Sequence, residues 1–270
     1  MAFFEHNRNR YYYFDAGAGT PTLLLHGLGN SGRAWTDQVG ALLRLGHRVI
    51  VPDLLGHGAS SNAPEHITPH LQAQELIALL DHLGLASTQL IGLSLGGMIA
   101  LELACAYPDA VDKLVVAASF ASMSSTARHQ QLDEWAENLR QPDGCLKRFK
   151  TTWPQLVGSS FAASSQGQSL YQAWHAQAAM QRARCQIHWC EGMKTYDLND
   201  RLSHIQAPTL VLGTDGDRIS PPGEAEAIAS RIAHAQLITL PGDGHVFNVS
   251  HAPAFNRALS GFLQEQQRHG

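Results

Sequence analysis

The sequence predicts an α/β fold in which helices flank a mostly parallel β-sheet. Two observations support this: short β-rich runs alternate with amphipathic segments in the first half of the chain, and the alternation returns near the end. Several of the short runs are apolar throughout, as expected for strands covered on both faces. Because a helix between parallel strands makes a right-handed crossover, a sheet with helices on both sides follows.

Seven segments have the pattern of strands. They are residues 11–15, 22–25, 48–51, 89–92, 114–117, 209–213 and 236–240. Helical spacing of apolar residues occurs at 33–45, 71–83, 95–106 and about 253–267. Gly46 and Gly84 follow two of these helices as C-terminal stop signals.

The alternation stops between about residues 120 and 203. That stretch contains scattered Trp, Gln, Ala and Arg at helical spacing, with little strand signal. We therefore predict a core formed by residues 1–119 and 204–270 and a helical lid formed by residues 120–203. Both boundaries depend on the change of pattern alone.

Composition narrows the function classes. A chain of 270 residues with 44% hydrophobic and 16% charged residues is typical of one elaborated globular domain. A net charge of -4 offers no basic field, so we expect no nucleic-acid partner. The chain shows neither a secretory signal nor an apolar run of membrane-spanning length, which predicts a soluble, cytoplasmic protein without a membrane partner. The four cysteines form no CxxC pair and no HExxH motif occurs, so no metal site is predicted.

Ser94 is the strongest candidate for a catalytic residue. It lies in a GxSxG motif, residues 92–96, between an apolar strand and a helix. A serine on a tight strand-to-helix turn is held clear of the sheet, and glycines are needed because the backbone folds back on itself. A glycine-rich turn with a serine N-cap has the same short pattern, so the surrounding residues must decide.

The base and the acid that a nucleophilic serine needs follow it in the expected order. Asp215 and Asp217 come after strand 209–213, and His245 comes after strand 236–240. Parallel strands present their carboxyl ends at one edge of the sheet, so these side chains can converge with Ser94. We predict His245 as the general base and one of the two aspartates as its orienting acid.

Backbone amides complete the predicted site. The loop after strand 22–25 reads HGLG at 26–29, where an amide can be directed at a developing oxyanion. We expect the N–H groups of Leu28 and Leu95 to form this oxyanion hole.

The same loop has a competing interpretation. Residues 27–32 fit the dinucleotide-binding pattern GxGxxG, and Asp53 ends the next strand at the spacing of a ribose-binding acid. Asp53, however, continues into a second glycine-rich loop at 52–60, and a dinucleotide site leaves Ser94 unexplained. We therefore favour the serine site.

Over nearly its whole length the chain resembles the α/β-hydrolase superfamily. The matching residues are HGLG at 26–29, PDLLGHGAS at 52–60, GLSLGG at 92–97, GDRISPP at 216–222 and GHVFN at 244–248. The resemblance implies an eight-stranded sheet, a Ser-Asp-His triad and a lid inserted after the sixth strand. It also favours Asp217 over Asp215, because the family's acid precedes a short apolar segment and a proline. Within the superfamily the chain is similar to small bacterial carboxylesterases, enol-lactonases of the 3-oxoadipate pathway and carbon-carbon hydrolases.

The predicted lid is rich in large apolar side chains. Trp153 and Trp174 are candidates for lining an acyl pocket, although packing of the lid on the core is the more common role of such residues. The basic residues Arg140, Lys147, Arg148 and Lys150 are either a site for a substrate carboxylate or coenzyme A phosphate, or a solvated helix face.

The sequence therefore predicts a serine hydrolase that cleaves a small carboxylic ester or lactone, without any cofactor. A thioesterase or a carbon-carbon bond hydrolase could use the same triad. A ligand-binding protein that keeps the fold without catalysis is the alternative from another class.

Overall fold

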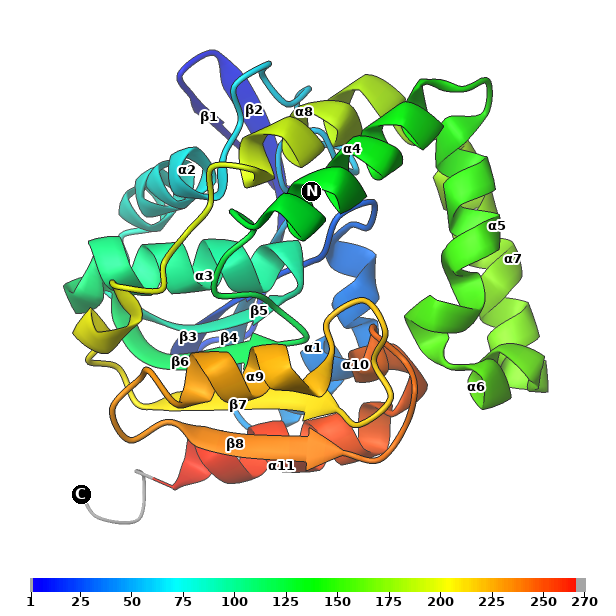
Figure 1. Ribbon diagram of the computed structural model, residues 1–270. Coiled ribbons are helices and arrows are strands. Elements are labelled where there is room, and N and C mark those ends of the chain that lie inside the picture. Colours follow the sequence, from blue (N-terminus) through cyan, green and yellow to red (C-terminus); the bar gives the residue numbers. More distant parts are fainter. Residues whose placement is uncertain (1, 266–270) are drawn as a thin grey trace.

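The computed structural model describes residues 2–265, in which eight strands form one sheet in the order β1-β2-β4-β3-β5-β6-β7-β8 (Figure 1). The strands are β1 Ala2–His6, β2 Asn9–Ala16, β3 Thr20–Leu25, β4 His47–Pro52, β5 Thr88–Leu93, β6 Val111–Ala117, β7 Thr209–Thr214 and β8 Gln236–Leu240. All neighbours from β4 to β8 are parallel, and β2 is antiparallel to both β1 and β4. The predicted fold class is thereby confirmed.

Burial explains why the central strands have no alternation of apolar and polar residues. Every residue of β5 and β7 is buried, as is the leucine run at the end of β3. Strands in the middle of a doubly covered sheet have no solvent face, so apolar residues follow one another without alternation.

The residue pattern alone did not predict β1. This strand pairs with β2 through a tight turn in which Asn7 and Arg8 have φ angles of 48° and 67°. Such hairpin turns usually contain glycine, which tolerates positive φ. Without a glycine, the hairpin gave no local signal in the sequence.

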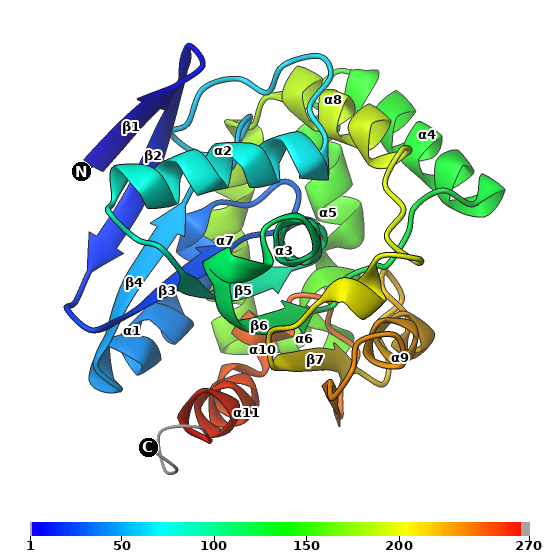
Figure 2. The same ribbon diagram turned by 90° about the vertical axis from the view of Figure 1, so that its left-hand side faces the viewer.

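Helices cover both faces of the sheet (Figure 2). The helices α2 Pro69–His82, α3 Leu95–Ala106 and α9 Pro222–Ala229 lie on one face, and α1 Thr36–Arg44 and α11 Ala252–Gln264 lie on the other. The short α10, Phe247–Ser250, precedes α11. The predicted helix at 253–267 corresponds to α11, and its residues 266 and 267 lie outside the described residues.

Five helices separate β6 from β7. They are α4 Thr126–Arg140, α5 Gly144–Val157, α6 Ser159–Ala163, α7 Ser165–Ala179 and α8 Ala183–Met193. Figure 1 shows α4 and α8 lying across the core, while α5, α6 and α7 stand to one side of it. The chain leaves and re-enters the core at neighbouring points, because Ser122 and Asp197 form an isolated antiparallel bridge. We keep the division at residues 120 and 203 as a prediction.

No helix within residues 2–265 combines the length and the apolar character needed to cross a bilayer.

Candidate active site

Ser94 lies on the turn between β5 and α3 and has the unusual backbone angles φ 55° and ψ -118°. The turn is possible only because its neighbours are small. A Cβ at Gly92 would lie 2.2 Å from the carbonyl oxygen of Gly96, and one at Gly96 would lie 2.1 Å from that of Leu25. Positive φ in a non-glycine residue is strained, and the packed turn holds Ser94 in this conformation.

Asp217 and His245 meet at the carboxyl ends of β7 and β8. Asp217 Oδ2 and His245 Nδ1 lie 2.8 Å apart, and both side chains are buried. The other carboxylate oxygen, Oδ1, accepts the backbone N–H groups of Ile219 and Ser220 at 2.8 and 3.0 Å. These bonds fix the carboxylate, which in turn orients the imidazole with Nε2 away from Asp217.

Asp215 occupies a different position. Its side chain is exposed, and its Oδ1 accepts the N–H of Gly242 at 2.9 Å. Asp215 therefore connects the loop after β7 to the loop after β8, and the geometry brings Asp217 to the histidine.

Two free amides lie beside Ser94. Among the hydrogen bonds of residues 2–265, neither the N–H of Leu28 nor that of Leu95 has an acceptor. Leu95 begins α3, where amides have no partner within the helix. The Leu28 loop is close, since a Cβ at Gly27 would lie 3.3 Å from Ser94 Cβ. Unpartnered N–H groups at this position suit an oxyanion.

Two buried histidines that sequence reasoning passed over hold that loop in place. His26 Nε2 accepts the N–H of Leu54 at 3.1 Å, and His57 Nε2 accepts that of Gly29 at 3.0 Å. Desolvation by burial lowers the pKa of both imidazoles. A neutral ring keeps one nitrogen as an acceptor, so both bonds persist at neutral pH.

Asp53 is held in place by the chain itself. Its two carboxylate oxygens accept the N–H groups of Gly32 and Ala59, each at 2.8 Å, and the residue is buried. These bonds join the two glycine-rich loops, so this carboxylate has a structural role that requires no ribose. The dinucleotide interpretation of the loop is therefore disfavoured.

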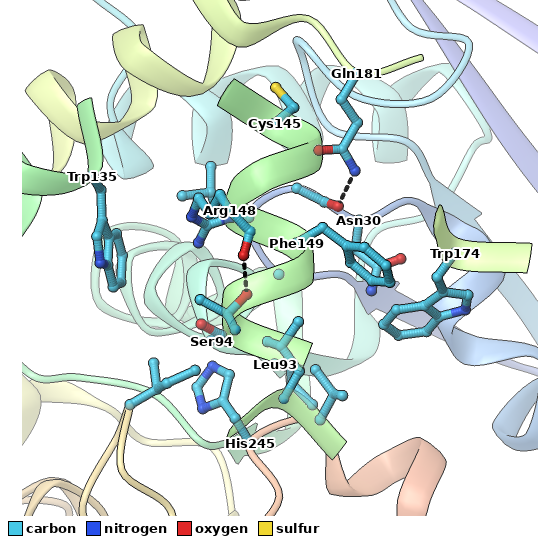
Figure 3. A pocket seen from close by; sticks show the side chains of 17 residues that line it. Asn30, Leu93, Ser94, Trp135, Cys145, Arg148, Phe149, Trp174, Gln181 and His245 are labelled. Carbon is cyan, nitrogen blue, oxygen red and sulfur yellow. Dashed lines mark hydrogen bonds between the residues drawn. The ribbon is translucent and has the colours of Figure 1, made fainter. Parts of the chain in front are cut away.

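Ser94, His245 and Leu28 line one pocket of about 60 Å³, whose opposite wall comes from the inserted helices (Figure 3). The insertion contributes aromatic and polar side chains to this wall: Trp135, Arg148, Phe149, Thr152, Trp174 and Gln181. Aromatic walls combined with convergent polar groups are typical of a site for a small ligand.

The two predicted tryptophans lie at different depths. Trp174 lines the pocket, whereas Trp153 is buried behind it. The ring of Trp153 is 5.9 Å from that of Trp174 and 5.4 Å from those of Phe149 and Tyr171. Trp135 also lines the pocket, and no feature of the sequence distinguished it from the other tryptophans.

The four residues of the predicted basic cluster also differ in their position relative to the pocket. Arg140, Lys147 and Lys150 are exposed, whereas Arg148 lines the pocket.

The insertion is bonded directly to the histidine loop. The N–H groups of His245 and Val246 donate to the carbonyl oxygens of Gln155 and Leu156, at 3.1 and 2.7 Å. Carbonyls in the last turn of a helix have no partner within it, so the end of α5 supplies free acceptors. The position of His245 thus depends on both parts of the chain.

Known proteins share this arrangement of strands and helices. Residues 20–252 match the family model described as alpha/beta hydrolase fold. A hydrolase from Pseudomonas aeruginosa is 28% identical, with a TM-score of 0.89 over 97% of each chain. A thermophilic esterase from Thermogutta terrifontis is 29% identical, with a TM-score of 0.86 over 95% of this chain and 94% of that one. A bromoperoxidase from Bacillus anthracis is 26% identical, with a TM-score of 0.86 over 95% of this chain and 96% of that one. The chain belongs to the alpha/beta hydrolase fold family.

Proposed function

We propose that the protein is a serine hydrolase that cleaves a small carboxylic ester or lactone through an acyl-enzyme. The observation that carries the proposal is that Ser94, Leu28 and His245 line one pocket, with Asp217 bonded to His245. The amides of Leu28 and of Leu95, the residue after Ser94, have no acceptor within residues 2–265. Each component supplies one requirement of acyl transfer: a nucleophile, an oriented base and donors for the oxyanion.

In the first step His245 Nε2 takes the proton of Ser94 as the hydroxyl oxygen bonds to the substrate carbonyl carbon. The negative charge moves to the carbonyl oxygen, which the amides of Leu28 and Leu95 stabilise. The carbon–oxygen bond to the leaving group then breaks, and His245 donates its proton to the departing alkoxide.

The second step repeats the first with water as the nucleophile. His245 takes a proton from the water as it attacks the acyl group on Ser94, and the same amides hold the oxyanion. The acid is released when the bond to Ser94 breaks and the serine recovers its proton. Within this mechanism, residues 120–203 act as a lid over a core formed by residues 1–119 and 204–270.

The pocket and a similar structure both favour a small ester as the substrate. The rings of Trp135, Phe149 and Trp174 line the pocket and limit the length of an acyl group. A similar structure, 29% identical, is an esterase. A thioester or a carbon–carbon bond next to a ketone could react at the same serine, so these bond types belong in the substrate panel.

Covalent labelling with a fluorophosphonate probe tests the proposal, since only an activated serine reacts. We expect one adduct, on Ser94, that disappears in Ser94→Ala. Folded protein without an adduct would instead support a ligand-binding protein without catalysis. A panel of p-nitrophenyl esters, lactones, acyl thioesters and vinylogous diketones then identifies the bond that is cleaved.

A further inference from the structure

Arg148 introduces a positive charge into the pocket that Ser94 and His245 line. It lies in α5, and Figure 3 shows its side chain among the residues that form the pocket wall. The guanidinium is close to the predicted oxyanion loop, because a Cβ at Gly29 would lie 3.3 Å from Arg148 Nη1. A ligand bound at Ser94 would therefore lie within reach of this charge.

The charge of Arg148 has no counter-ion within residues 2–265. Its Nη1 donates a long hydrogen bond of 3.5 Å to Gln186 Oε1. Its Cζ lies over the ring of Trp135, 5.1 Å from the ring centre. Its Nε is buried and donates to no acceptor among the described residues. Among the other arginines of residues 2–265 that are at least partly buried, three pair with a carboxylate within 3.0 Å: Arg48 with Asp15, Arg128 with Glu224 and Arg201 with Glu102. The fourth, Arg182, donates to the carbonyl oxygen of Ser60 and to Asn62 Oδ1.

Neighbouring thiols do not balance the charge. Cys145 and Cys190 are close enough to influence Arg148, but burial raises the pKa of both thiols, that of Cys190 to about 11. Both are therefore uncharged at neutral pH. Desolvation by burial lowers the pKa of Arg148 itself, yet an arginine side chain stays protonated in proteins.

An unpaired guanidinium that is largely removed from water is costly unless a ligand pairs with it. Its planar set of N–H donors matches the two oxygens of a carboxylate. Packing of α5 does not require it, since an uncharged residue could cover Trp135 without this cost.

We propose that Arg148 binds a carboxylate of the substrate, so that the preferred substrates are esters or lactones that also carry a negatively charged carboxylate. The inference rests on the proposed hydrolase function and names its substrate class. Arg148 acts in recognition, whereas the reaction itself proceeds at Ser94.

A matched pair of substrates tests the preference. Mono-p-nitrophenyl glutarate and p-nitrophenyl valerate have the same chain length and differ in the terminal carboxylate. After subtraction of the uncatalysed rate, we expect the wild-type kcat/KM to be higher for the glutarate ester. In Arg148→Gln the ratio of the two kcat/KM values should fall about tenfold or more, mainly through KM.

Lys147→Gln is the matched control, because Lys147 is the preceding residue of α5, is exposed and does not line the pocket. It should leave the ratio unchanged. Equal ratios in the wild type and Arg148→Gln, or a wild-type preference for the neutral ester, would overturn the proposal.

Thermal shifts separate this inference from the proposed function. This measurement needs no enzyme activity, so it can be made in Ser94→Ala. There glutarate should raise Tm and glutaramide should not. The rise in Tm with glutarate should vanish in the double variant that also carries Arg148→Gln. If Arg148→Gln does not fold, the comparison of glutarate with glutaramide in Ser94→Ala still tests whether the pocket binds a carboxylate. Fluorophosphonate labelling of Ser94 without a glutarate effect would refute the carboxylate site and leave the hydrolase function standing. A glutarate effect without labelling would refute the hydrolase function alone.

Arg148→Met distinguishes a binding role from a structural one. Replacing an unpaired, partly buried charge by an apolar side chain of similar length should leave Tm unchanged or raise it. A clear fall in Tm, with no change in the glutarate effect, would assign Arg148 to packing.

Discussion

The carboxyl edge of the sheet and the inserted helices line the same pocket but differ in how the charged side chains of the pocket are paired. At the sheet edge Asp217 bonds to His245 and to two backbone amides. In the insertion the buried Nε of Arg148 has no acceptor within residues 2–265. At the sheet edge, Asp217 and His245 are thus paired before any ligand binds. In the insertion, Arg148 can still pair with a ligand. This difference suits a division in which the core performs the reaction and the insertion selects the substrate.

The largest effects are expected from the two residues that move the proton. Ser94→Ala and His245→Ala should each reduce kcat by roughly 10⁴- to 10⁶-fold. The double variant should lose little more, because the two side chains act as a unit. Steady-state kinetics of the three variants measure this, with circular dichroism as the control for folding. Losses that multiply in the double variant would contradict a shared mechanism.

The next largest effect is expected from Asp217, which can be compared with Asp215 in the same loop of the core. Asp217→Asn should reduce kcat on the order of 10⁴-fold, because an amide no longer fixes the tautomer of His245. Asp215→Asn is the matched control two residues away, and its exposed side chain only accepts a bond from Gly242. It should alter kcat little. The reverse ranking would show that Asp215 orients the histidine.

How far the sequence predicted the molecule differs between these two regions. In the core, parallel strands end at one edge, so the topology placed Ser94, His245 and the loop that contains Asp215 and Asp217 near one another. The choice of Asp217 came from the family resemblance. The strand that the residue pattern did not predict is β1. Its turn at Asn7 and Arg8 lacks the glycine that usually marks such turns. Its pairing depends on contacts with β2 that no local pattern reveals.

In the insertion, the sequence predicted helices but not how they are rotated. Neighbouring residues on a helix point about 100° apart. Lys147 is therefore exposed, while Arg148 faces the pocket. Trp153 and Trp174 are distinguished in the same way, by the packing of α5 against α7. Helical spacing alone gives no information about which neighbour a helix will contact.

The two tryptophans offer a comparison within the insertion. Trp174→Ala should enlarge the pocket and shift the optimum of kcat/KM toward longer acyl chains, since each added methylene contributes about 0.8 kcal/mol while room remains. Trp153→Ala removes a buried ring that contacts three aromatic neighbours, and should lower the free energy of unfolding by about 3–5 kcal/mol. A p-nitrophenyl ester series and thermal melts measure both effects. An unchanged chain-length profile in Trp174→Ala would show that its ring does not limit the acyl site.

The smallest effect concerns the attachment of the insertion to the core. Arg182 precedes α8, and both of its terminal nitrogens donate to the carbonyl oxygen of Ser60 at 3.0 Å; Nη1 also donates to Asn62 Oδ1 at 2.9 Å. Hydrogen bonds from a charged donor contribute about 1–3 kcal/mol, so Arg182→Ala should lower Tm by a few degrees. Arg184 is exposed and two residues away, so Arg184→Ala is the control.

The position of these bonds predicts more than a loss of stability. Because Arg182 joins the α7–α8 connection to the loop after β4, its removal should loosen the insertion without altering the sheet edge. Hydrogen exchange should therefore accelerate in α7 and α8 and stay unchanged in β5 and α3. KM should rise more than kcat falls, because Ser94, His245 and Asp217 keep their geometry while the opposite wall of the pocket becomes mobile. If exchange accelerates equally in both regions, or Arg184→Ala has the same effect, the insertion and the core are one cooperative unit and the division between reaction and selection fails.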